Sequence, residues 1–296
     1  LFDLGRINLL CDSHFCDIRN KEAFSTLIKN LQPEIVFHLA AQPLVRESYQ
    51  VPSETYNTNV MGTVHLLDAL RSVKCVKVGV MATTDKVYSN KEWNWPYREE
   101  DMLGGHDPYS ASKAASEIVI ASFRNSFLDQ QGIAIASARA GNVIGGGDWA
   151  SNRIIPDCIR SWSKNKKPEI RNPHATRPWQ HVLEPLCGYL KLAQKLYYDN
   201  RKKYSGSWNF GPNTKNNLKV KQIAVIGKKI LGSKSKIIIK KKKFYESENL
   251  SLDSAKALKL LNWKTHLSDF QALKMTYDWF RIFYCNKGKK RDMIKF

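Results

Sequence analysis

Two short clusters of chemically reactive side chains lie about 25 residues apart in the chain. The first contains Thr84, Asp85 and Lys86, and the second pairs Tyr109 with Lys113. On a helix, a spacing of four residues puts Tyr109 and Lys113 on one face. A nearby ammonium favours a phenolate, so we expect Lys113 to lower the pKa of Tyr109 from ~10 towards the range of a general base. Tyrosine and lysine at this spacing are also common on solvated helices, but a helix directly after the strand that carries Thr84 favours chemistry.

The segments that would position these side chains alternate between strand and helix patterns. Short runs that are apolar on both faces and rich in small or β-branched residues are typical of parallel strands; they span residues 34–41, 76–84 and 133–141. Helical patterns span residues 53–72 and 108–127. This alternation predicts a doubly wound parallel α/β sheet of the Rossmann type, with ligands at the carboxyl ends of the strands.

The pattern changes after residue 142, within the glycine-rich stretch "GNVIGGGDWA" (141–150). We expect a dinucleotide-binding domain over residues 1–142 and a smaller α/β substrate-binding domain over residues 143–296. The strand-like "SGSWNFGPN" near residue 210 indicates that some of the second half crosses back to the first domain.

The start of the chain departs from the usual pattern of such sheets. A dinucleotide-binding sheet normally opens with a strand and a Gly-rich turn that holds the pyrophosphate. Here the first twenty residues contain no G-x-x-G-x-x-G, and they look like a strand that ends at Asp17. We therefore expect the first strand, the Gly-rich turn and the second strand to be missing, and the chain to be a fragment.

The composition limits the partners. The net charge is +20, which favours anionic partners, but no nucleic-acid-binding motif accompanies the Lys-rich segments 236–244 and 286–296. We therefore expect no nucleic-acid partner, and a Lys-rich composition on solvated faces. No apolar run approaches the ~20 residues that span a bilayer, and no signal peptide is recognisable, so we expect no membrane association.

The cysteines indicate neither a disulfide framework nor a metal site. The chain has six, none in a Cys-x-x-Cys arrangement. Cys11, His14 and Cys16 are close together, but no second pair of ligands follows at zinc-site spacing. Free thiols in a reducing cytoplasm are the expectation, with no bound metal.

Longer motifs carry a family resemblance. Tyr109-x-x-x-Lys113, together with "HLAAQ" (38–42), "TNVMGT" (58–63) and "TTDK" (83–86), resembles the extended short-chain dehydrogenase/reductase family. Within it, the blocks "AAQPLVRESY", "NVMGTVHLLDAL", "DPYSASKAASE", "ARAGNVIGGGDWA" and "RPWQHVLEPLCGYL" are similar to the CDP-glucose 4,6-dehydratase branch. The similarity extends over about residues 2 to 280.

The resemblance implies a hydro-lyase that uses NAD to convert CDP-glucose to CDP-4-keto-6-deoxyglucose, for deoxysugars of surface polysaccharides such as the O-antigen of lipopolysaccharide. It implies that Tyr109 takes the C4 hydroxyl proton, with Thr84 bonded to the same oxygen. Lys86 would remove the C5 proton, and Asp85 would protonate the departing C6 hydroxyl. A lysine that acts as a base must first lose its own proton.

The same resemblance assigns the binding residues. Those implied to contact or position NAD are Asp17, Ile18, Leu39, Ala40, Ala41, Gln42, Asn59, Thr83, Tyr109, Lys113 and Arg139. Those implied to bind the nucleotide sugar are Asn142, Arg153 and Arg177, with Trp149 and Trp179 either stacking on the cytosine or filling the core. Arginine suits phosphate because its planar fork donates two hydrogen bonds. The helices at 53–72 and 108–125 are the dimer surface that the family implies.

Two alternatives remain open. The first is a sugar-nucleotide epimerase or decarboxylase of the same fold, but a simple C4 epimerisation needs no elimination acid and base such as Asp85 and Lys86. A non-catalytic basic relative is the other alternative, and the intact Thr84, Tyr109 and Lys113 argue against it. His38 is expected to be a structural strand residue.

Overall fold

A four-stranded parallel sheet forms the centre of the molecule. The computed structural model describes residues 1–212, 218–240 and 247–285. In these residues the sheet has the strand order β1-β2-β3-β7, with every neighbouring pair parallel. The strands are β1 (Ile35–His38), β2 (Val78–Ala82), β3 (Ala134–Ala140) and β7 (Gly206–Phe210). Every residue of β3 is buried, and apart from Ser137 and Arg139 its side chains are alanine and isoleucine, as expected of a strand covered on both faces.

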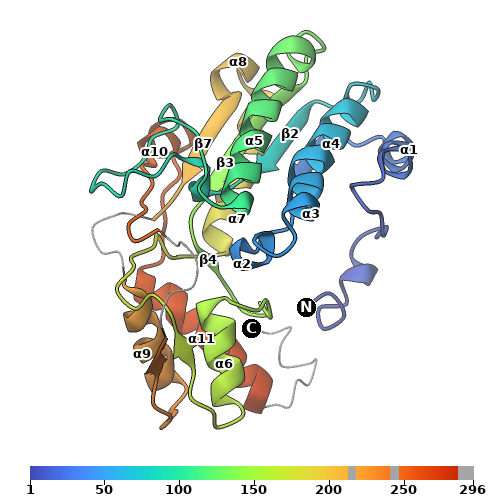
Figure 1. The fold of residues 1–296 in the computed structure, drawn as a ribbon. Helices are drawn as coiled ribbons and strands as arrows, with labels where there is room; N and C mark the ends of the chain where they lie inside the picture. Colours follow the sequence, from blue (N-terminus) through green and yellow to red (C-terminus); the bar gives the residue numbers. More distant parts are fainter. Residues whose placement is uncertain (213–217, 241–246, 286–296) are drawn as a thin grey trace.

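One face of the sheet is covered by helices from the first half of the chain (Figure 1). They are α1 (Lys21–Leu31), α3 (Pro52–Tyr56), η2 (Asn57–Met61), α4 (Gly62–Leu70), α5 (Pro108–Phe123) and η4 (Arg124–Leu128). Leu67 and Leu70 of α4 pack with Ile120 of α5 and Ile135 of β3 in one apolar core.

The opposite face is covered by helices from the second half of the chain: α7 (Leu183–Tyr198), α8 (Arg201–Tyr204) and α10 (Ala255–Leu261). Leu192 and Leu196 of α7 pack with Trp208 and Phe210 of β7 in a second core. Helices on both faces of a parallel sheet confirm the predicted doubly wound fold, and α7, β7 and α10 are the part of the chain that crosses back.

The predicted elements differ from the structure at three places. The helix expected over residues 108–127 is the α-helix α5 only to Phe123, and the π-helical η4 continues it to Leu128. The helix expected over residues 53–72 is three successive helical segments, because η2 is a π-helical turn between α3 and α4. The prediction of a strand before Asp17 is wrong, because this stretch holds only the short helix η1 (Ile7–Leu9) and irregular chain. A strand needs a hydrogen-bonded neighbour, and β1, the edge strand, pairs only with β2 in the part that the structure describes.

A smaller layer of helices lies beyond the carboxyl ends of β2 and β3 (Figure 1). Its helices are α6 (Ile154–Trp162), α9 (Val220–Ile230) and α11 (Asp269–Cys285). Two parallel strand pairs accompany them, β4 (Val143–Ile144) with β6 (Gln180–His181) and β5 (Glu169–Ile170) with β8 (Ile238–Ile239). Apolar residues at helical spacing, including Ile155, Ile159 and Trp162 of α6, form a separate third core.

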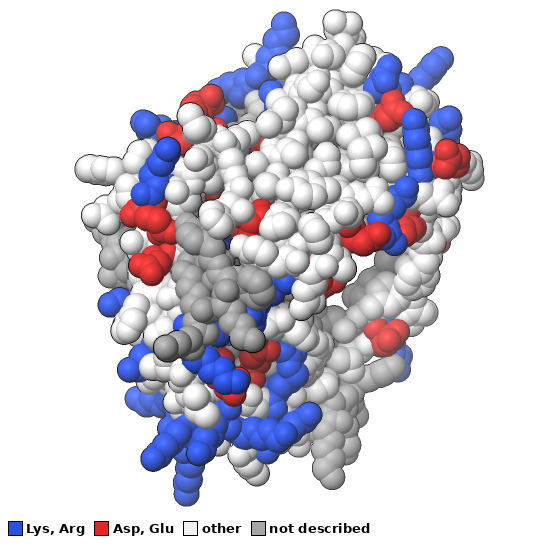
Figure 2. Space-filling model, in the orientation of Figure 1, with Lys and Arg blue, Asp and Glu red and all other residues white. Residues whose placement is uncertain are grey.

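Charge is unevenly distributed over the surface. Figure 2 shows Lys and Arg gathered at the end of the molecule formed by α6 and α9, whereas the face over α4 and α5 is almost uncharged. The Lys-rich segment 286–296 and residues 241–244 lie outside the described residues. No helix in the described part of the chain is long and apolar enough to cross a membrane.

Candidate active site

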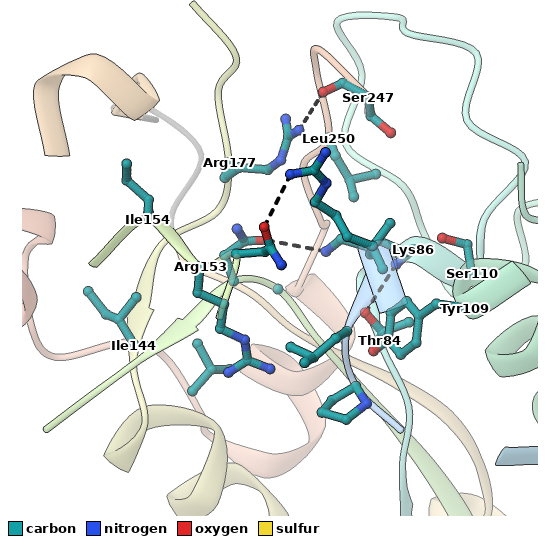
Figure 3. Close-up of a pocket in the computed structure, with 18 of the residues that line it drawn as sticks. Thr84, Lys86, Tyr109, Ser110, Ile144, Arg153, Ile154, Arg177, Ser247 and Leu250 are labelled. Carbon is teal, nitrogen blue, oxygen red and sulfur yellow. Dashed lines mark hydrogen bonds between the residues drawn. The ribbon is translucent and has the colours of Figure 1, made fainter. Parts of the chain in front are cut away.

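A cavity of about 670 Å³ lies at the carboxyl ends of β2 and β3. It opens between the sheet and the smaller helical layer, and Thr84, Lys86 and Tyr109 line it (Figure 3). Two short helices, α2 (Val45–Ser48) and η3 (Asp85–Val87), border it. The structure therefore brings together the two clusters that are about 25 residues apart in the sequence, at the edge of the sheet where ligands of such folds bind.

Thr84, Asp85 and Lys86 form one hydrogen-bonded group. Thr84 caps η3, and its hydroxyl donates to Asp85 Oδ1 at 3.1 Å. Lys86 Nζ donates to the same carboxylate oxygen at 2.8 Å and to Asn142 Oδ1 at 3.2 Å. Asp85 is fully buried, and its second oxygen, Oδ2, has no hydrogen-bond partner among the described residues. A buried carboxylate with an unused acceptor is suited to proton transfer.

Tyr109 is fixed by the start of α5. Asp107 caps this helix by accepting from Ser110 N at 2.9 Å, and Pro108 occupies the first turn, where its missing N–H costs nothing. The N–H of Tyr109 donates to Ser48 Oγ of α2 at 3.0 Å. One turn later, Lys113 donates to the carbonyl of Ala82, at the end of β2, at 3.2 Å.

The expected lowering of the phenol pKa is wrong for the structure as it stands. Burial raises the pKa of Tyr109 to about 12, and the hydrogen bond with Thr84 and the charge of Arg153 only partly oppose it. Burial also lowers the pKa of Lys113 to about 8. Desolvation therefore outweighs neighbouring charge at both groups. Lys113 remains mostly protonated at pH 7.

The residues after β1 have side chains that are open to a ligand. Leu39 is 56% exposed, and Ala40 and Ala41 follow it at the carboxyl end of the strand. Asn59 holds the next residue by accepting from Gln42 N at 2.8 Å and donating to Gln42 O at 3.1 Å. Asn59 is itself fully buried, so its role is to fix the backbone of this loop.

Asp17 and Ile18 lie in the irregular segment before α1. Arg19 binds the Asp17 carboxylate through its side chain and its backbone N–H, and lowers the pKa of that carboxyl to about 2. The carbonyl of Ile18 accepts from His65 Nδ1 at 2.9 Å. The Ile18 side chain lies against Gly62 of α4, where a Cβ would come within 2.5 Å of it. The glycine therefore permits close packing of this segment on α4.

The interpretation of Arg139 as a cofactor ligand is wrong. Its guanidinium is buried in the sheet and all five of its N–H donors are engaged. They bind Glu117 twice, Tyr88, Ser207 and the carbonyl of Glu99. No donor is left for a cofactor.

Three of the predicted sugar-nucleotide residues line the cavity, together with one of the two tryptophans. Figure 3 shows Arg153 and Arg177 on the side opposite Tyr109, and Asn142 and Trp179 also line the cavity. Arg153 pairs with Asp148 at 3.1 Å, while Arg177 donates to the carbonyls of Thr176, Ser247 and Glu248.

The second tryptophan does not line the cavity. Among the described lining residues Trp149 is absent. Its ring packs against Phe280, Phe283 and Tyr284 of α11 with centroid distances of 5.2, 5.2 and 6.2 Å. The alternative in which Trp149 stabilises the core is therefore the one that the structure favours. Trp179 belongs to the third core and also lines the cavity, and its indole N–H donates to Leu218 O at 2.9 Å.

Sequence reasoning missed two further arginines. Arg46 of α2 and Arg171 after β5 also line the cavity, and both contact Asn152. Arg46 lies inside "AAQPLVRESY", a block already selected for its family resemblance, so that block was the available signal. Four arginines therefore line the described part of this cavity, and such a concentration of guanidinium groups suits a diphosphate.

Fold and site together define a nucleotide-sugar-modifying enzyme of the short-chain dehydrogenase/reductase type. The sequence profile of the family described as GDP-mannose 4,6 dehydratase matches residues 6–276. The chain belongs to this family. The predicted family resemblance is confirmed.

Comparison with individual relatives agrees with this family assignment. The chain is 46% identical over 307 aligned residues to CDP-glucose 4,6-dehydratase of Salmonella typhimurium, covering 99% of this chain and 85% of that protein. It is 27% identical to UDP-glucose 4-epimerase 2 of Oryza sativa, covering 90% and 67%.

Solved structures show the same fold. UDP-glucose 4-epimerase of Thermotoga maritima superposes with a TM-score of 0.81 at 22% identity, covering 92% of this chain and 84% of that one. For dTDP-glucose 4,6-dehydratase of Bacillus anthracis, in complex with NAD, the TM-score is 0.76 at 22% identity, with 94% and 79% covered.

Proposed function

We propose that this protein is an NAD-dependent hydro-lyase that converts CDP-glucose to CDP-4-keto-6-deoxyglucose. The observation that carries the proposal is the Asp85–Lys86 pair beside Tyr109 in a cavity lined by arginines. An acid and a base next to an oxidising site are what elimination of water requires in addition to oxidation. The 46% identity to a CDP-glucose 4,6-dehydratase supports the choice of substrate.

The residues around β1 and α5 fit a dinucleotide. Lys113 uses one of its three N–H donors on Ala82 O, so among the described residues it retains donors for ribose hydroxyls. Leu39, Ala40, Ala41 and Gln42 offer an open loop beside it, and Ile18 lies on α4, next to Asp17, as the outer part of the site. Bound there, NAD supplies the acceptor and later the donor of the hydride that leaves C4 and returns to C6.

Tyr109 and Thr84 act on the C4 hydroxyl. Tyr109 takes its proton, and the Thr84 hydroxyl holds the same oxygen. The raised pKa of Tyr109 means that the phenol is protonated at neutral pH before substrate arrives. Substrate binding must therefore favour its ionisation, and the positive charge of Arg153 already acts in that direction.

Asp85 and Lys86 share one proton between them. Its transfer across their 2.8 Å contact converts the ion pair into a neutral amine beside a neutral carboxylic acid. These are the protonation states that elimination requires. Lys86 then takes the C5 proton, Asp85 protonates the C6 hydroxyl, the C6–O bond breaks, and water leaves as the C5–C6 double bond forms. Lys86 returns its proton to C5 when C6 is reduced, and the proton that Tyr109 took from the C4 hydroxyl restores Asp85 through Thr84, which is hydrogen-bonded to both.

The isotope that starts at C4 provides the test. With [4-²H]CDP-glucose, catalytic NAD and this protein, we expect the deuterium at C6 of a 4-keto-6-deoxy product and no net accumulation of NADH. Loss of the label to water would contradict the mechanism. A C4 epimer with the label still at C4 would indicate an epimerase instead.

The division into domains, the cellular location and the partners belong to the same proposal. We infer a division after residue 142, with residues 1–142 holding the dinucleotide, and residues 143–296, apart from the segments that cross back, holding the sugar nucleotide. The two parts have separate apolar cores, which supports this division. The enzyme acts in the cytoplasm, on the path to deoxysugars of surface polysaccharides, without a nucleic-acid partner.

A homodimer through α3–α4 and α5 is also part of the proposal. Figure 2 shows an almost uncharged face over α4 and α5. Tyr56, Met61 and Ile118 on these elements are 39%, 42% and 61% exposed. Exposed apolar side chains on an uncharged face are typical of subunit interfaces.

A further inference from the structure

A buried carboxylate lies on α5 one turn beyond Lys113. Glu117 is 3% exposed, and its two oxygens accept hydrogen bonds from four side chains. The donors are Thr83 Oγ1, Ser137 Oγ at 2.7 Å, Arg139 Nε and Nη2 at 3.0 and 2.8 Å, and Ser207 Oγ at 3.4 Å. This carboxylate is ionised, because Arg139 and the hydroxyl donors outweigh burial and lower its pKa.

Arg139 extends the network across the sheet. It leaves β3 towards Tyr88, whose phenol lies 2.9 Å from Arg139 Nη1, and towards Ser207 Oγ of β7 at the same distance. Tyr88 in turn donates to Asn209 Oδ1 of β7 at 2.7 Å. One buried ion pair therefore joins α5 to the ends of β2, β3 and β7.

The segment that this pair fixes is the one that carries the reactive groups. Thr83, held by Glu117, directly precedes Thr84. Lys113, one turn before Glu117, donates to Ala82 O, the residue before Thr83. Two adjacent residues at the end of β2 are thus tied to two adjacent turns of α5.

We propose that Glu117 and Arg139 are positioning residues that fix Lys113 and Thr84 relative to each other. This rests on the proposed function, in which Thr84 and Lys113 serve the oxidation step. Neither Glu117 nor Arg139 lines the described part of the cavity, so both act through their neighbours.

The electrostatics of Lys113 support this. Burial lowers its pKa to about 8, and the charge of Glu117 is what opposes that fall. The other titratable groups near Lys113 are His38 of β1, which its charge reaches, and Tyr109, one turn earlier on α5. His38 is neutral at pH 7, since burial and Lys113 lower its pKa to about 4. Without Glu117, the pKa of Lys113 falls further, and Lys113 loses its proton at a lower pH.

The test compares Glu117→Gln with Glu184→Gln. Glu184 is an equally buried carboxylate that binds the N–H groups of His266 and Leu267, away from α5. We expect Glu117→Gln to lower kcat for CDP-glucose by up to about 10²-fold through misplaced groups, with KM nearly unchanged. Its activity should also decline with rising pH about one pH unit earlier than that of the wild type. Glu184→Gln should change only the melting temperature.

A second variant keeps the proposal testable if Glu117→Gln does not fold. Removing one partner of a buried pair is strongly destabilising, whereas replacing both is often tolerated. Glu117→Gln combined with Arg139→Gln should fold and still show the lower kcat and the earlier alkaline decline. If both Glu117 variants keep the wild-type kcat and pH profile, and change only the melting temperature, the pair is structural and the proposal is overturned.

A readout that does not use the sugar separates this proposal from the proposed function. Calorimetric titration of NAD over pH 6–9 reports the charge of Lys113 directly. We expect the affinity of Glu117→Gln to fall at a lower pH than that of the wild type. If the wild type binds NAD but does not turn over CDP-glucose, the proposed function fails and this shift still decides the role of Glu117. An unshifted profile of NAD affinity against pH would overturn the proposed role of Glu117.

Discussion

At the scale of single residues, Tyr109 and Lys86 act at different steps of the proposed reaction, and substitutions should separate them. Tyr109→Phe removes the base for oxidation, and we expect a loss of about 10² to 10⁴-fold in the first step. Lys86→Ala leaves oxidation possible but stops elimination, so reduced cofactor should accumulate. Single-turnover absorbance of NADH distinguishes the two. Lys74→Ala, at an exposed position before β2, is the control. Equal early blocks in both variants would remove Lys86 from the role of base.

The arginines should contribute to binding rather than to chemistry. Arg153 is 40% exposed at its side chain and lies within electrostatic reach of Tyr109, so Arg153→Ala removes a charged donor from the cavity. We expect the Kd for CDP-glucose to rise about ten- to a hundredfold, the equivalent of ~1.5–3 kcal/mol for a hydrogen bond to a charged group. Arg71→Ala, at the opposite end of the sheet, should leave it unchanged. Calorimetry measures both, and an unaltered Kd for Arg153→Ala would place Arg153 outside the binding site.

Residue types and spacing were sufficient to predict that Thr84, Lys86 and Tyr109 meet, because strand ends and helix starts coincide in a parallel sheet. They did not predict the fate of Arg139. Whether an arginine faces a ligand or the core depends on a partner distant in sequence, and here Glu117, 22 positions earlier, takes it. The prediction of a lowered pKa for Tyr109 was wrong for a similar reason, because burial raises this pKa and burial is a property of the folded molecule.

At the scale of elements, strand-like runs located the four strands of the central sheet to within a few residues, and the signature is strongest in β2 and β3, which are buried on both faces. The segment before Asp17 was misread because its apolar residues look the same whether or not a neighbouring strand is present. Phe15, for instance, is 98% exposed. The π-helical turn η2 between α3 and α4 leaves no trace in a 3.6-residue periodicity.

The edge strand β1 should make stability depend on pH. His38 contacts Thr63 Oγ1 of α4 at 3.3 Å, and burial, followed by the charge of Lys113, lowers its pKa from 6.5 to about 4. As the pH falls, His38 therefore takes up a proton in the unfolded chain at a higher pH than it does in the folded protein. Neutral His38 contributes at most about 3 kcal/mol to the free energy of unfolding. This contribution is complete above about pH 6.5 and is lost as the pH falls towards 4.

His38→Gln, which cannot titrate, should flatten this dependence. We expect the melting temperature of the wild type to fall more steeply between pH 7 and pH 5 than that of the variant. His174→Gln, at an exposed position in the loop after β5, provides the matched control and should follow the wild type. Parallel curves for all three proteins would show that His38 is not the group responsible.

At the scale of the whole molecule, charge and apolar surface are segregated. Lys and Arg gather at the end formed by α6 and α9, and the face over α4 and α5 carries few charges (Figure 2). A protein with a net charge of +20 repels copies of itself at low salt, unless they meet through such an uncharged face. The same segregation leaves the cavity, with its four arginines, between the two regions, where a diphosphate is attracted from solution.

The uncharged face should therefore hold two copies of the chain together. We expect sedimentation equilibrium to give twice the monomer mass of 33.9 kDa at micromolar concentration. Ile118→Glu, at a position 61% exposed on α5, should shift the protein to monomers, because a carboxylate buried in an interface has no partner. Val225→Glu, 49% exposed on α9 at the basic end, is the matched control and should remain dimeric. A monomeric wild type, or an Ile118→Glu variant that dimerises as well as the control, would exclude this face as the interface.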